Sequence, residues 1–361
     1  MKRILILTNN DIGLYRFRKE LIERLLKRDK VIISLPNGEY IQEFVNIGCK
    51  FIDTDISRRG TNPVTDFKLL LKYLKMIRDV KPDIVLTYTI KPNVYGGLAC
   101  QMLGIPYIAN ITGLGTAVEN EGLLQKVALI LYKLGLRKSK TIFFQNEENM
   151  NFMQRYNIGK KNGKLIPGSG VNLNHFILQE YPTDETIEFV FISRIMKQKG
   201  IDQYIETAQY IKKKYSTTKF HICGFCEEEY EEKLDSLHKE GVVEYHGMVK
   251  DVREILKRTH CTIHPTYYPE GMSNVLLESA ASGRPIITTN RSGCREIIDN
   301  GINGYIVEQK NSADLIKKVE RFMELSHEEK KQMGLEGRKK VEREFDRRIV
   351  VNAYIEEIKK M

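Results

Sequence analysis

Two glutamates, Glu270 and Glu278, stand eight positions apart at the ends of a turn that is predicted to continue as a helix. Ser273 is the expected N-cap of this helix over residues 274–282. The amides around the cap are expected to donate to an oxygen-rich anion. They belong to Gly271, Met272, Ser273 and Asn274. Glu278 would lie roughly 7 Å along the axis, from about 1.5 Å of rise per residue. This separation suits a nucleotide-sugar, with the hexose near Glu270 and the ribose near Glu278, although an ordinary helix start has the same pattern.

Two cations precede this segment in the sequence. Arg194 and Lys199 lie in a turn that begins at Ser193, between a predicted strand over residues 187–192 and the helix that follows Gly200. Fixed cations beside a helix start can neutralise a diphosphate, and arginine can hold it in bidentate fashion. Since the helix dipole disfavours cations at this end, their presence favours an anionic ligand over the alternative of a solvated basic turn. Ser193, Arg194 and Lys199 are therefore candidate site residues.

Apolar β-like runs alternate with amphipathic helical stretches along the 361 residues, a pattern that predicts an α/β protein with parallel sheets and helices on both faces. The length favours two domains. Strands of the first are expected at residues 4–7, 31–35, 50–53, 84–87, 107–110 and 141–144. Strands of the second are expected at residues 187–192, 219–223, 242–245, 261–264, 285–288 and 305–307. Sites in such sheets form at the carboxyl ends of strands.

Loops of the first half offer further candidates. Gly13 follows the first strand in a turn before a helix, and its backbone is a candidate ligand contact, although a plain connecting turn fits equally well. Thr112 and Gly113 follow the fifth strand, where glycines allow a ligand to approach the backbone closely. The polar segments 87–89 and 91–93 stand at the end of the fourth strand. Their side chains are expected to face the ligand cleft at the carboxyl ends of the strands.

General acid or base candidates are scarce in the first half, because all seven histidines fall at or after His175. This weakens a mechanism that depends on a histidine base, and Asp11 or Glu119 would have to take its place. His264 is interpreted as structural. The motifs are interpreted as those of a metal-independent site, so no metal site and no cofactor is predicted.

Taken together, these motifs resemble glycosyltransferase family 4, the retaining GT-B enzymes that use nucleotide-sugars. The resemblance rests on Arg194 with Lys199, the Glu270 to Glu278 segment, and the runs 280–287 and 293–296, whose form is similar to the branch that acts on polyprenyl-diphosphate-linked saccharides. It implies two facing Rossmann-like domains with a cleft between them, over residues 1–170 and 171–346, with a last helix at 347–361 that packs back on the first domain.

The resemblance also implies roles for individual residues. Arg194 and Lys199 would hold the diphosphate, Glu270 and the amides after it would contact the sugar, and Glu278 would contact the ribose. Main-chain groups would hold the uracil. They belong to Gly224, Met248 and Val249.

Composition sets broader limits. The formal net charge of +10 suits nucleic acid, an anionic membrane face or phosphorylated substrates, but aromatic and basic residues are not interleaved as in nucleic-acid binders. A cytoplasmic protein is expected, since neither a long apolar span nor a signal peptide is evident. The role of Cys223 and Cys226, which stand close together among six cysteines, is left open between a plain turn and a redox pair.

The stretch 123–138 combines a broad apolar face with cations, so it is either a Rossmann helix packed on its sheet or a helix at an anionic membrane surface. The predicted protein is a retaining hexosyltransferase that moves a hexosyl or N-acetylhexosaminyl unit from a UDP-sugar to a lipid-linked saccharide for capsule, O-antigen or glycoprotein glycans, at the inner face of the membrane. Two alternatives are a nucleotide-sugar epimerase of the same fold and a non-catalytic partner of a membrane synthase. The donor sugar, the acceptor glycan and the oligomeric state are not specified by the sequence.

Overall fold

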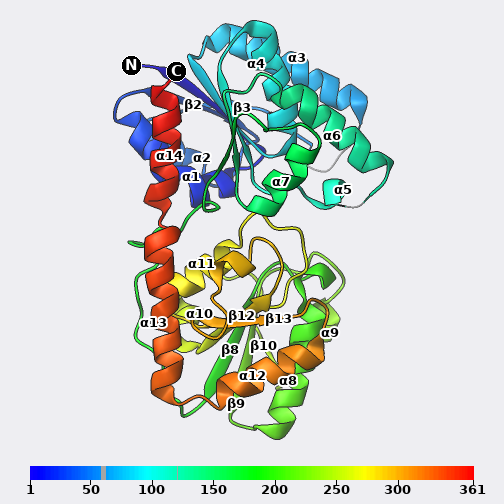
Figure 1. The fold of residues 1–361 in the computed structure, drawn as a ribbon, viewed down its shortest axis with the longest axis vertical. Coiled ribbons are helices and arrows are strands. Elements are labelled where there is room, and N and C mark those ends of the chain that lie inside the picture. The colour runs from blue at the N-terminus through cyan, green and yellow to red at the C-terminus, as the bar shows by residue number, and fades with distance from the viewer. Residues whose placement is uncertain (58–61, 120) are drawn as a thin grey trace. The chain divides into compact units, whose positions relative to one another are not determined.

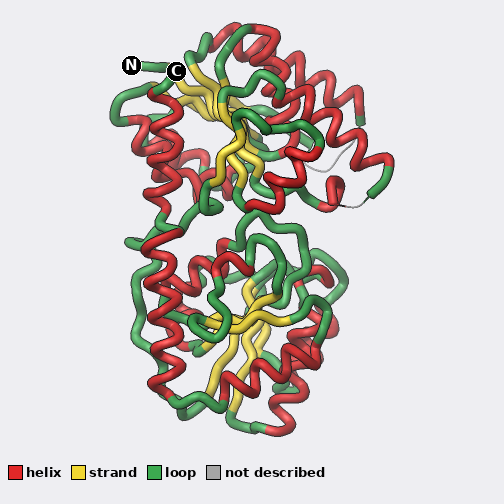
Figure 2. The backbone as a smooth tube through the Cα atoms, in the orientation of Figure 1, coloured by secondary structure: helices red, strands yellow, loops and turns green. Residues whose placement is uncertain are grey.

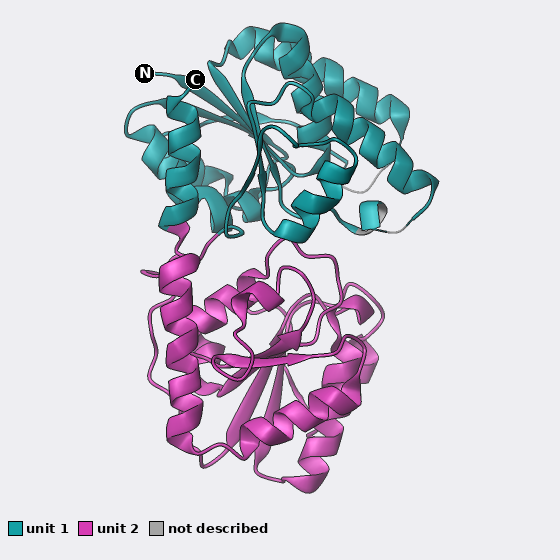
Figure 3. Ribbon diagram, viewed as in Figure 1, with its two compact units in different colours: residues 1–169, 348–361 teal, residues 170–347 magenta. Residues whose placement is uncertain are grey.

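The computed structural model describes residues 1–57, 62–119 and 121–361 (Figure 1). The chain divides into two compact units, which Figure 3 distinguishes by colour. Unit 1 comprises residues 1–169 and 348–361, and unit 2 comprises residues 170–347. The boundary expected from the sequence fell after residue 170. Each unit is a parallel sheet covered by helices.

Unit 1 contains a seven-stranded parallel sheet in the order β3-β2-β1-β4-β5-β6-β7. Its strands are β1 (Arg3–Leu7), β2 (Lys30–Leu35), β3 (Lys50–Asp53), β4 (Ile84–Tyr88), β5 (Tyr107–Ile111), β6 (Thr141–Phe144) and β7 (Gly163–Leu165). Its helices are α1 (Asp11–Leu26), α2 (Ile41–Asn46), α3 (Pro63–Val80), the π-helix η1 (Pro92–Gly96), α4 (Gly97–Leu103), α5 (Thr116–Glu119), α6 (Leu123–Leu136), α7 (Glu147–Arg155) and α14 (Arg347–Lys359). The strand order reverses direction between β1 and β4, which creates a switch point at the carboxyl edge.

The two faces of this sheet bury alternate residues of each strand, as a two-residue period requires. Ile4 and Ile6 of β1 pack with α1, α2 and α14, whereas Leu5 and Leu7 pack with α3 and α4. The helices α3, α4 and α6 therefore cover one face and α1 and α14 cover the other (Figure 1). Among the described residues no helix is long and apolar enough to cross a membrane.

Unit 2 contains a six-stranded parallel sheet in the order β10-β9-β8-β11-β12-β13. Its strands are β8 (Ile187–Ile192), β9 (Thr218–Cys223), β10 (Glu244–Tyr245), β11 (Cys261–His264), β12 (Ile286–Thr289) and β13 (Gly304–Val307). Its helices are the 3-10 helix η2 (Lys197–Lys199), α8 (Ile201–Lys214), α9 (Glu231–Lys239), α10 (Arg253–Arg258), α11 (Asn274–Ala281), the 3-10 helix η3 (Arg295–Ile297), α12 (Ser312–Met323) and α13 (His327–Glu344). Its switch point lies between β8 and β11, and the strands form the centre of each unit, with helices outside (Figure 2).

The twelve strands expected from buried apolar runs are all present, with ends that shift by at most two residues. The edge strand β7 was not predicted, because only three residues, of which one is apolar, form it. The N-cap of α3 is Asn62, whose side chain accepts from the amide of Val64 at 2.9 Å, and Pro63 occupies the first turn.

The helix α14 lies against unit 1, as the resemblance implied. Tyr354 packs in the core beside Phe143, and its hydroxyl accepts a hydrogen bond from Asn110 Nδ2 at 2.7 Å. Glu357 accepts from Thr141 Oγ1 at 2.6 Å and pairs with Lys164 Nζ at 2.7 Å. Lys360 approaches the same carboxylate at 2.5 Å. The last helix is therefore joined to β5, β6 and β7 by polar contacts as well as by apolar packing.

Glu357→Gln tests this attachment. Burial alone would raise the pKa of Glu357, but the lysines and the Thr141 hydroxyl outweigh burial and lower that pKa from 4.5 to about 2. A lowered pKa contributes stability above the unfolded-state value, and this contribution is lost as the pH falls through the folded-state value. At neutral pH we expect Glu357→Gln to lower the free energy of unfolding by about 1.5–3 kcal/mol, the range for hydrogen bonds to charged groups. The difference from wild type should shrink between about pH 4.5 and pH 2 in urea denaturation series.

The matched control is Glu356→Gln, because Glu356 is exposed on the same helix. A deficit for Glu357→Gln that stays constant down to pH 2, or that equals the effect of the control, contradicts the assigned role.

Candidate functional site

The carboxyl ends of β8 and β11 meet at the switch point of unit 2, where the ammonium of Lys199 pairs with the carboxylate of Glu270. Lys199 belongs to η2, after β8, and Glu270 belongs to the loop after β11. The two loops are also joined through the backbone, because the Tyr267 amide donates to the Gln198 carbonyl at 2.9 Å. The exposed fractions of the two charged side chains are only 8% and 17%. Two predicted site residues, 71 positions apart in sequence, are thus brought into direct contact.

Arg194 joins this group through an aromatic ring. Its guanidinium carbon lies 5.2 Å from the centre of the Tyr268 ring, and Lys199 Nζ lies 4.7 Å from the same centre. The guanidinium also pairs with Glu227. Burial opposes the charged form of Arg194, but the contacts with Tyr268 and Glu227 outweigh it and raise the pKa of Arg194 above its ordinary value. Both cations are therefore held in position, and each retains further N–H donors for an anion.

His264, at the end of β11, lies beside this cluster and is fully buried. Burial lowers its pKa to about 3, and the charge of Lys199 acts in the same direction. Neither ring nitrogen has a hydrogen-bond partner within the described structure. His264 is therefore neutral at working pH, which fits a structural role and adds no third positive charge.

Two glycines let the loops at this edge approach closely. Gly200 has φ 82°, and a Cβ built on it would lie 2.2 Å from the Pro265 carbonyl oxygen. Gly224, after β9, has φ 151°, and a Cβ there would lie 1.7 Å from the Ser193 carbonyl oxygen. The Gly224 amide donates to the Gly247 carbonyl at 2.7 Å. The turns after β8, β9 and β10 thus touch through their backbones, and only residues without a side chain fit at these points.

The backbone groups that were predicted to hold the uracil lie in these turns. Met248 and Val249 follow Gly247, with Met248 64% exposed and Val249 packed against the apolar cluster beneath α10. Since Gly224 and Gly247 are hydrogen-bonded, the structure brings the predicted base-contacting segments together.

The start of α11 differs in detail from the prediction. Ser273 is the N-cap by position, but its side chain makes no capping hydrogen bond. Its amide, predicted to be open to an anion, instead donates to the Gly293 carbonyl at 2.8 Å. The expectation of a free amide at Ser273 was therefore wrong, because the segment around Gly293 packs on this turn. Met272 is 6% exposed and belongs to the core, so only its backbone is available there.

Two other predicted residues lie in the same helix. Asn274 begins α11, and its Oδ1 atom is buried without a hydrogen-bond partner in the described structure. Glu278 lies one turn further along and is half-buried, and its backbone carbonyl accepts from Ser282. Both residues are thus on the helix that begins beside Glu270.

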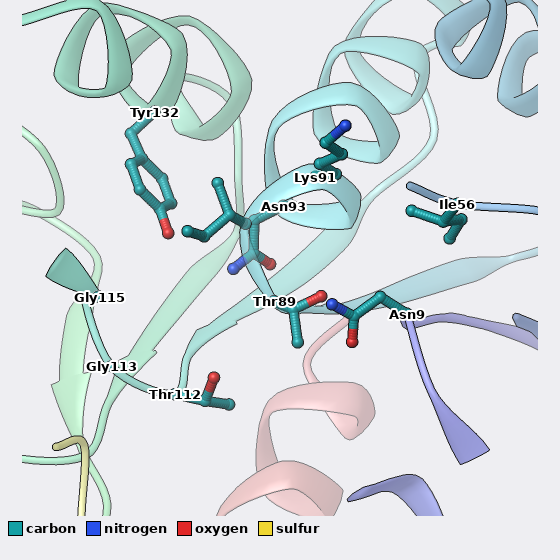
Figure 4. A pocket seen from close by; sticks show the side chains of 10 residues that line it. Asn9, Ile56, Thr89, Lys91, Asn93, Thr112, Gly113, Gly115 and Tyr132 are labelled. Carbon is teal, nitrogen blue, oxygen red and sulfur yellow. The ribbon is translucent and has the colours of Figure 1, made fainter. Parts of the chain in front are cut away.

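A pocket of about 190 Å³ occupies the corresponding position in unit 1. Its lining comes from the loops after β1, β3, β4 and β5, and from η1 and α6 (Figure 4). The lining residues are Asn9, Ile56, Thr89, Ile90, Lys91, Asn93, Thr112, Gly113, Gly115 and Tyr132. Five residues that were expected to line the cleft lie around this pocket: Thr89, Lys91, Asn93, Thr112 and Gly113. Their contact with a ligand stays a prediction. The pocket is below the roughly 300 Å³ at which drug-sized sites begin, so it suits one compact polar group.

Some polar side chains in this pocket have partners within the described part of the protein, and others do not. Lys91 pairs with Asp66 at 2.6 Å, and Asn93 donates to the Asn110 carbonyl at 2.8 Å. Thr89 has φ 69°, which is rare for a β-branched residue, and its hydroxyl is buried without a partner in the described structure. Figure 4 shows the Asn9 and Thr89 side chains next to each other. The strained Thr89 therefore offers an unused hydrogen-bonding group at the switch point.

Gly13 does not line this pocket. The helix α1 begins at Asp11, so Gly13 lies within its first turn, and its amide donates to the Asn10 side chain at 2.6 Å. The predicted glycine turn after β1 was therefore wrong in this respect. Asp11, considered as a base, is buried and accepts from the Tyr40 amide at 2.9 Å, whereas Glu119 is exposed in α5.

Sequence reasoning missed Tyr268 and Glu227. Tyr268 stands two positions before Glu270 and could have been suspected from that neighbour. Glu227 gave no local signal, because its contact with Arg194 depends on how the turns after β8 and β9 pack. The cysteines carry no activated thiolate: Cys223 and Cys226 are both free, and burial raises the pKa of each, to about 12 for Cys223.

Gly224→Ala tests the close packing of the turns. Because the new Cβ would overlap the Ser193 carbonyl, we expect a free energy of unfolding about 1–3 kcal/mol below that of the control Gly241→Ala. Gly241 also has positive φ, 71°, but no atom lies within 4 Å of its built Cβ. Equal losses in denaturant titrations of the two variants would show that backbone conformation alone, and not contact with Ser193, requires glycine here.

Comparisons with known proteins agree with this geometry. Residues 175–340 match the family model of glycosyl transferases group 1, and residues 3–146 match that of the glycosyl transferase 4-like proteins. The N,N'-diacetylbacillosaminyl-diphospho-undecaprenol alpha-1,3-N-acetylgalactosaminyltransferase of Campylobacter jejuni is 29% identical, over 89% of each chain. The UDP-Gal:alpha-D-GlcNAc-diphosphoundecaprenol alpha-1,3-galactosyltransferase of Escherichia coli is 25% identical, over 80% of this chain and 81% of that one.

Among solved structures, Anabaena HepE in complex with UDP and glucose superposes with a TM-score of 0.81, at 15% identity over 100% of both chains. This likeness concerns the fold. The two family matches together span most of the sequence, and each coincides with one sheet and its switch point. The chain therefore belongs to the group 1 and 4-like glycosyltransferases, and it is a glycosyltransferase with the GT-B fold.

Proposed function

We propose that this glycosyltransferase moves a hexosyl or N-acetylhexosaminyl unit, with retention, from a UDP-sugar to a polyprenyl-diphosphate-linked saccharide. The observation that carries the proposal is the cluster of Arg194, Lys199 and Glu270 around Tyr268 at the switch point of unit 2. The relatives from Campylobacter jejuni and Escherichia coli carry diphospho-undecaprenol substrates in their names, and the second also carries UDP-Gal. The coincidence of a site that holds two cations with these names supports both the donor and the acceptor class.

The chemistry follows from the charges. As the bond from the sugar to the diphosphate breaks, negative charge grows on the leaving oxygen, and fixed donors that wait for this charge stabilise it. Arg194 and Lys199 are such donors. We assign the acceptor proton to the leaving diphosphate, since His264 is buried away from protonation and Asp11 is engaged with the Tyr40 amide. No metal or other cofactor is required in this scheme.

Glu270 has two roles in the proposal. Before the donor binds, its carboxylate holds Lys199 in place, and the pair is nearly excluded from solvent. When the donor is present, the same carboxylate accepts hydrogen bonds from sugar hydroxyls, while Lys199 turns its remaining N–H groups to the diphosphate. Glu278 and the backbone of the turns at Gly224 and Met248 receive the nucleoside. The pocket of unit 1, with Thr89, receives a polar group of the acceptor.

An exposed apolar stripe on α6 supports attachment to an anionic membrane, where a lipid-linked acceptor resides. The helix packs on the sheet through Leu129, Tyr132 and Leu136 and presents other apolar side chains to solvent. The exposed ones are Leu123, Leu124, Val127, Ile130 and Leu134. The sequence contains no acidic residue from position 122 to 146, so the exposed cations beside the stripe face no acidic neighbour on that segment. Apolar insertion with surrounding cations is typical of a helix at a lipid surface.

The donor-site assignment predicts that Arg194→Ala and Lys199→Ala each lower turnover by about 10²- to 10³-fold, the range for removal of one transition-state charge stabiliser. Lys197→Ala is the matched control, since Lys197 is an exposed cation in the same turn, and it should retain activity. Glu278→Ala should act mainly on KM, because a ribose contact is equal in ground and transition states.

These rates are measured by release of UDP with a lipid-linked acceptor, with and without EDTA. Near-normal turnover in both Arg194→Ala and Lys199→Ala, or a strict requirement for added magnesium or manganese, contradicts the proposal. A product that is an epimerised sugar nucleotide, formed without acceptor, assigns the chain to the epimerase alternative.

The membrane assignment predicts that combined Lys133→Glu, Arg137→Glu and Lys138→Glu reduces binding to phosphatidylglycerol liposomes at least about tenfold, because each cation contributes roughly 1 kcal/mol near such a surface. Binding should also fall as sodium chloride rises. The charge-matched control replaces three other exposed cations by Glu: Lys27, Arg28 and Lys30. They follow α1, on the other side of the sheet. Sedimentation that is unchanged in the first variant, or reduced equally in both, contradicts docking through α6.

A further inference from the structure

A second cluster of polar side chains lies on the edge of the unit 2 sheet, outside the groups assigned above. His221 of β9, Glu244 of β10 and His246, which follows β10, each present one ligand atom, and all three atoms lie within 4.8 Å of one another. His221 and Glu244 are directly paired in the ladder. Because side chains alternate along a strand, His221 points to the face opposite Phe220 and Ile222, which belong to the apolar core. The cluster is therefore produced by strand register.

Hydrogen bonds define which nitrogen of His221 is available. Nε2 of His221 lies 2.7 Å from a carboxylate oxygen of Glu188 on β8, so this nitrogen carries the proton and donates it. The other nitrogen, Nδ1, faces Nε2 of His246 at 3.0 Å and Glu244 Oε2 at 3.3 Å. A carboxylate that fixes the tautomer of a histidine is the usual outer partner of a metal-bound imidazole.

The spacing of the three ligand atoms suits a tetrahedral ion. Metal–ligand bonds of about 2.0–2.1 Å place tetrahedral ligand atoms roughly 3.3 Å apart. The distances of 3.0 Å and 3.3 Å from His221 Nδ1 are close to this value. In the free protein one proton on His246 Nε2 occupies the space between the rings, and an ion would replace it.

We propose that His221, Glu244 and His246 form a binding site for a divalent transition-metal ion of the zinc class. Two imidazoles and one carboxylate are a donor set that such ions prefer over magnesium or calcium. His221 is fully buried, whereas Glu244 is 37% exposed in its side chain, so the site opens to solvent on one side and a water molecule can complete the coordination. The ion would join β9 to the segment that begins with His246.

Two cations near the site limit its affinity. Arg258 Nη2 lies 3.4 Å from His246 Nε2 and 4.0 Å from Glu244 Oε2. Lys219 Nζ lies 3.7 Å from Glu244 Oε1. Since like charges repel an incoming divalent ion, removal of the Arg258 charge should strengthen binding. This expectation distinguishes the site from a surface where zinc associates through scattered side chains.

The test is a titration of the full chain with zinc and with cobalt(II), followed by calorimetry and by the visible spectrum of cobalt. One ion per chain should bind with a four-coordinate spectrum that lacks a thiolate charge-transfer band, which excludes the six free cysteines as ligands. Glu188→Gln should weaken binding about 10- to 100-fold, the effect of losing a carboxylate that orients a ligand histidine. His246→Ala and Glu244→Ala should weaken it at least as much, and Arg258→Gln should strengthen it.

His327→Ala is the matched control, because His327 is a partly exposed histidine that pairs with Asp184 elsewhere in unit 2. Circular dichroism of each variant checks that it is folded, and His221 is left intact because it is buried. Unaltered stoichiometric binding in folded His246→Ala and Glu244→Ala, a thiolate spectrum, or absence of any binding at submillimolar metal overturns the proposal. These readouts do not involve sugar transfer, so their failure is separate from failure of the proposed function.

Discussion

The reversal of strand order between β8 and β11 is the constraint on which the candidate site depends. In a parallel sheet, neighbouring strands from opposite sides of the switch send their chains away in opposite directions, and this leaves space at the carboxyl edge. Lys199 and Glu270 enter that space from the two strands and form one ion pair. Unit 1 repeats the same order, and its pocket with Asn9 and Thr89 lies at the equivalent junction of β1 and β4. One topological feature thus produces both hollows.

Charge in the candidate donor site is balanced before any ligand arrives. Arg194 and Lys199 each have a carboxylate partner, and Tyr268 lies against both cations. Holding a cation by a carboxylate avoids the cost of an unpaired buried charge, and it fixes the side chain before binding. The neutral state of the buried His264 belongs to the same balance, because a protonated imidazole beside Lys199 would meet repulsion and no hydrogen-bond acceptor. The arrangement is prepared for an anion without an excess of positive charge.

Much of the fold could be predicted from the sequence, because buried parallel strands appear as short apolar runs and both sheets consist of such runs. Arg194, Lys199 and Glu270 could be placed beside strand ends from the sequence, because each belongs to a local segment that follows a predicted strand. Their roles, and that of Glu278, stay predictions. β7 was not predicted, because its three residues are too few to show a strand pattern. The prediction of a free amide at Ser273 was wrong, because the hydrogen-bond partner of this amide, Gly293, is distant in sequence. The contacts of Tyr268 and Glu227 depend on how separate loops pack, and no local spacing records such packing. Segment 87–89 was predicted to line the cleft, but the positive φ of Thr89 was not.

At the edge of the unit 2 sheet, side-chain hydrogen bonds hold the last strand in addition to a few backbone hydrogen bonds. The strand β10 contributes only two residues to the sheet, so few backbone hydrogen bonds hold it. Instead, Tyr245 donates its hydroxyl to the Gly224 carbonyl at 3.2 Å and its amide to His238 at 3.2 Å, while His221 contacts Glu244 and His246. Short, polar edge strands also resist pairing with other chains. The Gly247 carbonyl accepts a hydrogen bond from the Gly224 amide. The side chains that hold β10 therefore also position the backbone that is proposed to hold the nucleoside base. The cluster of His221, Glu244 and His246 is therefore connected through one edge strand to the site where transfer is proposed to occur.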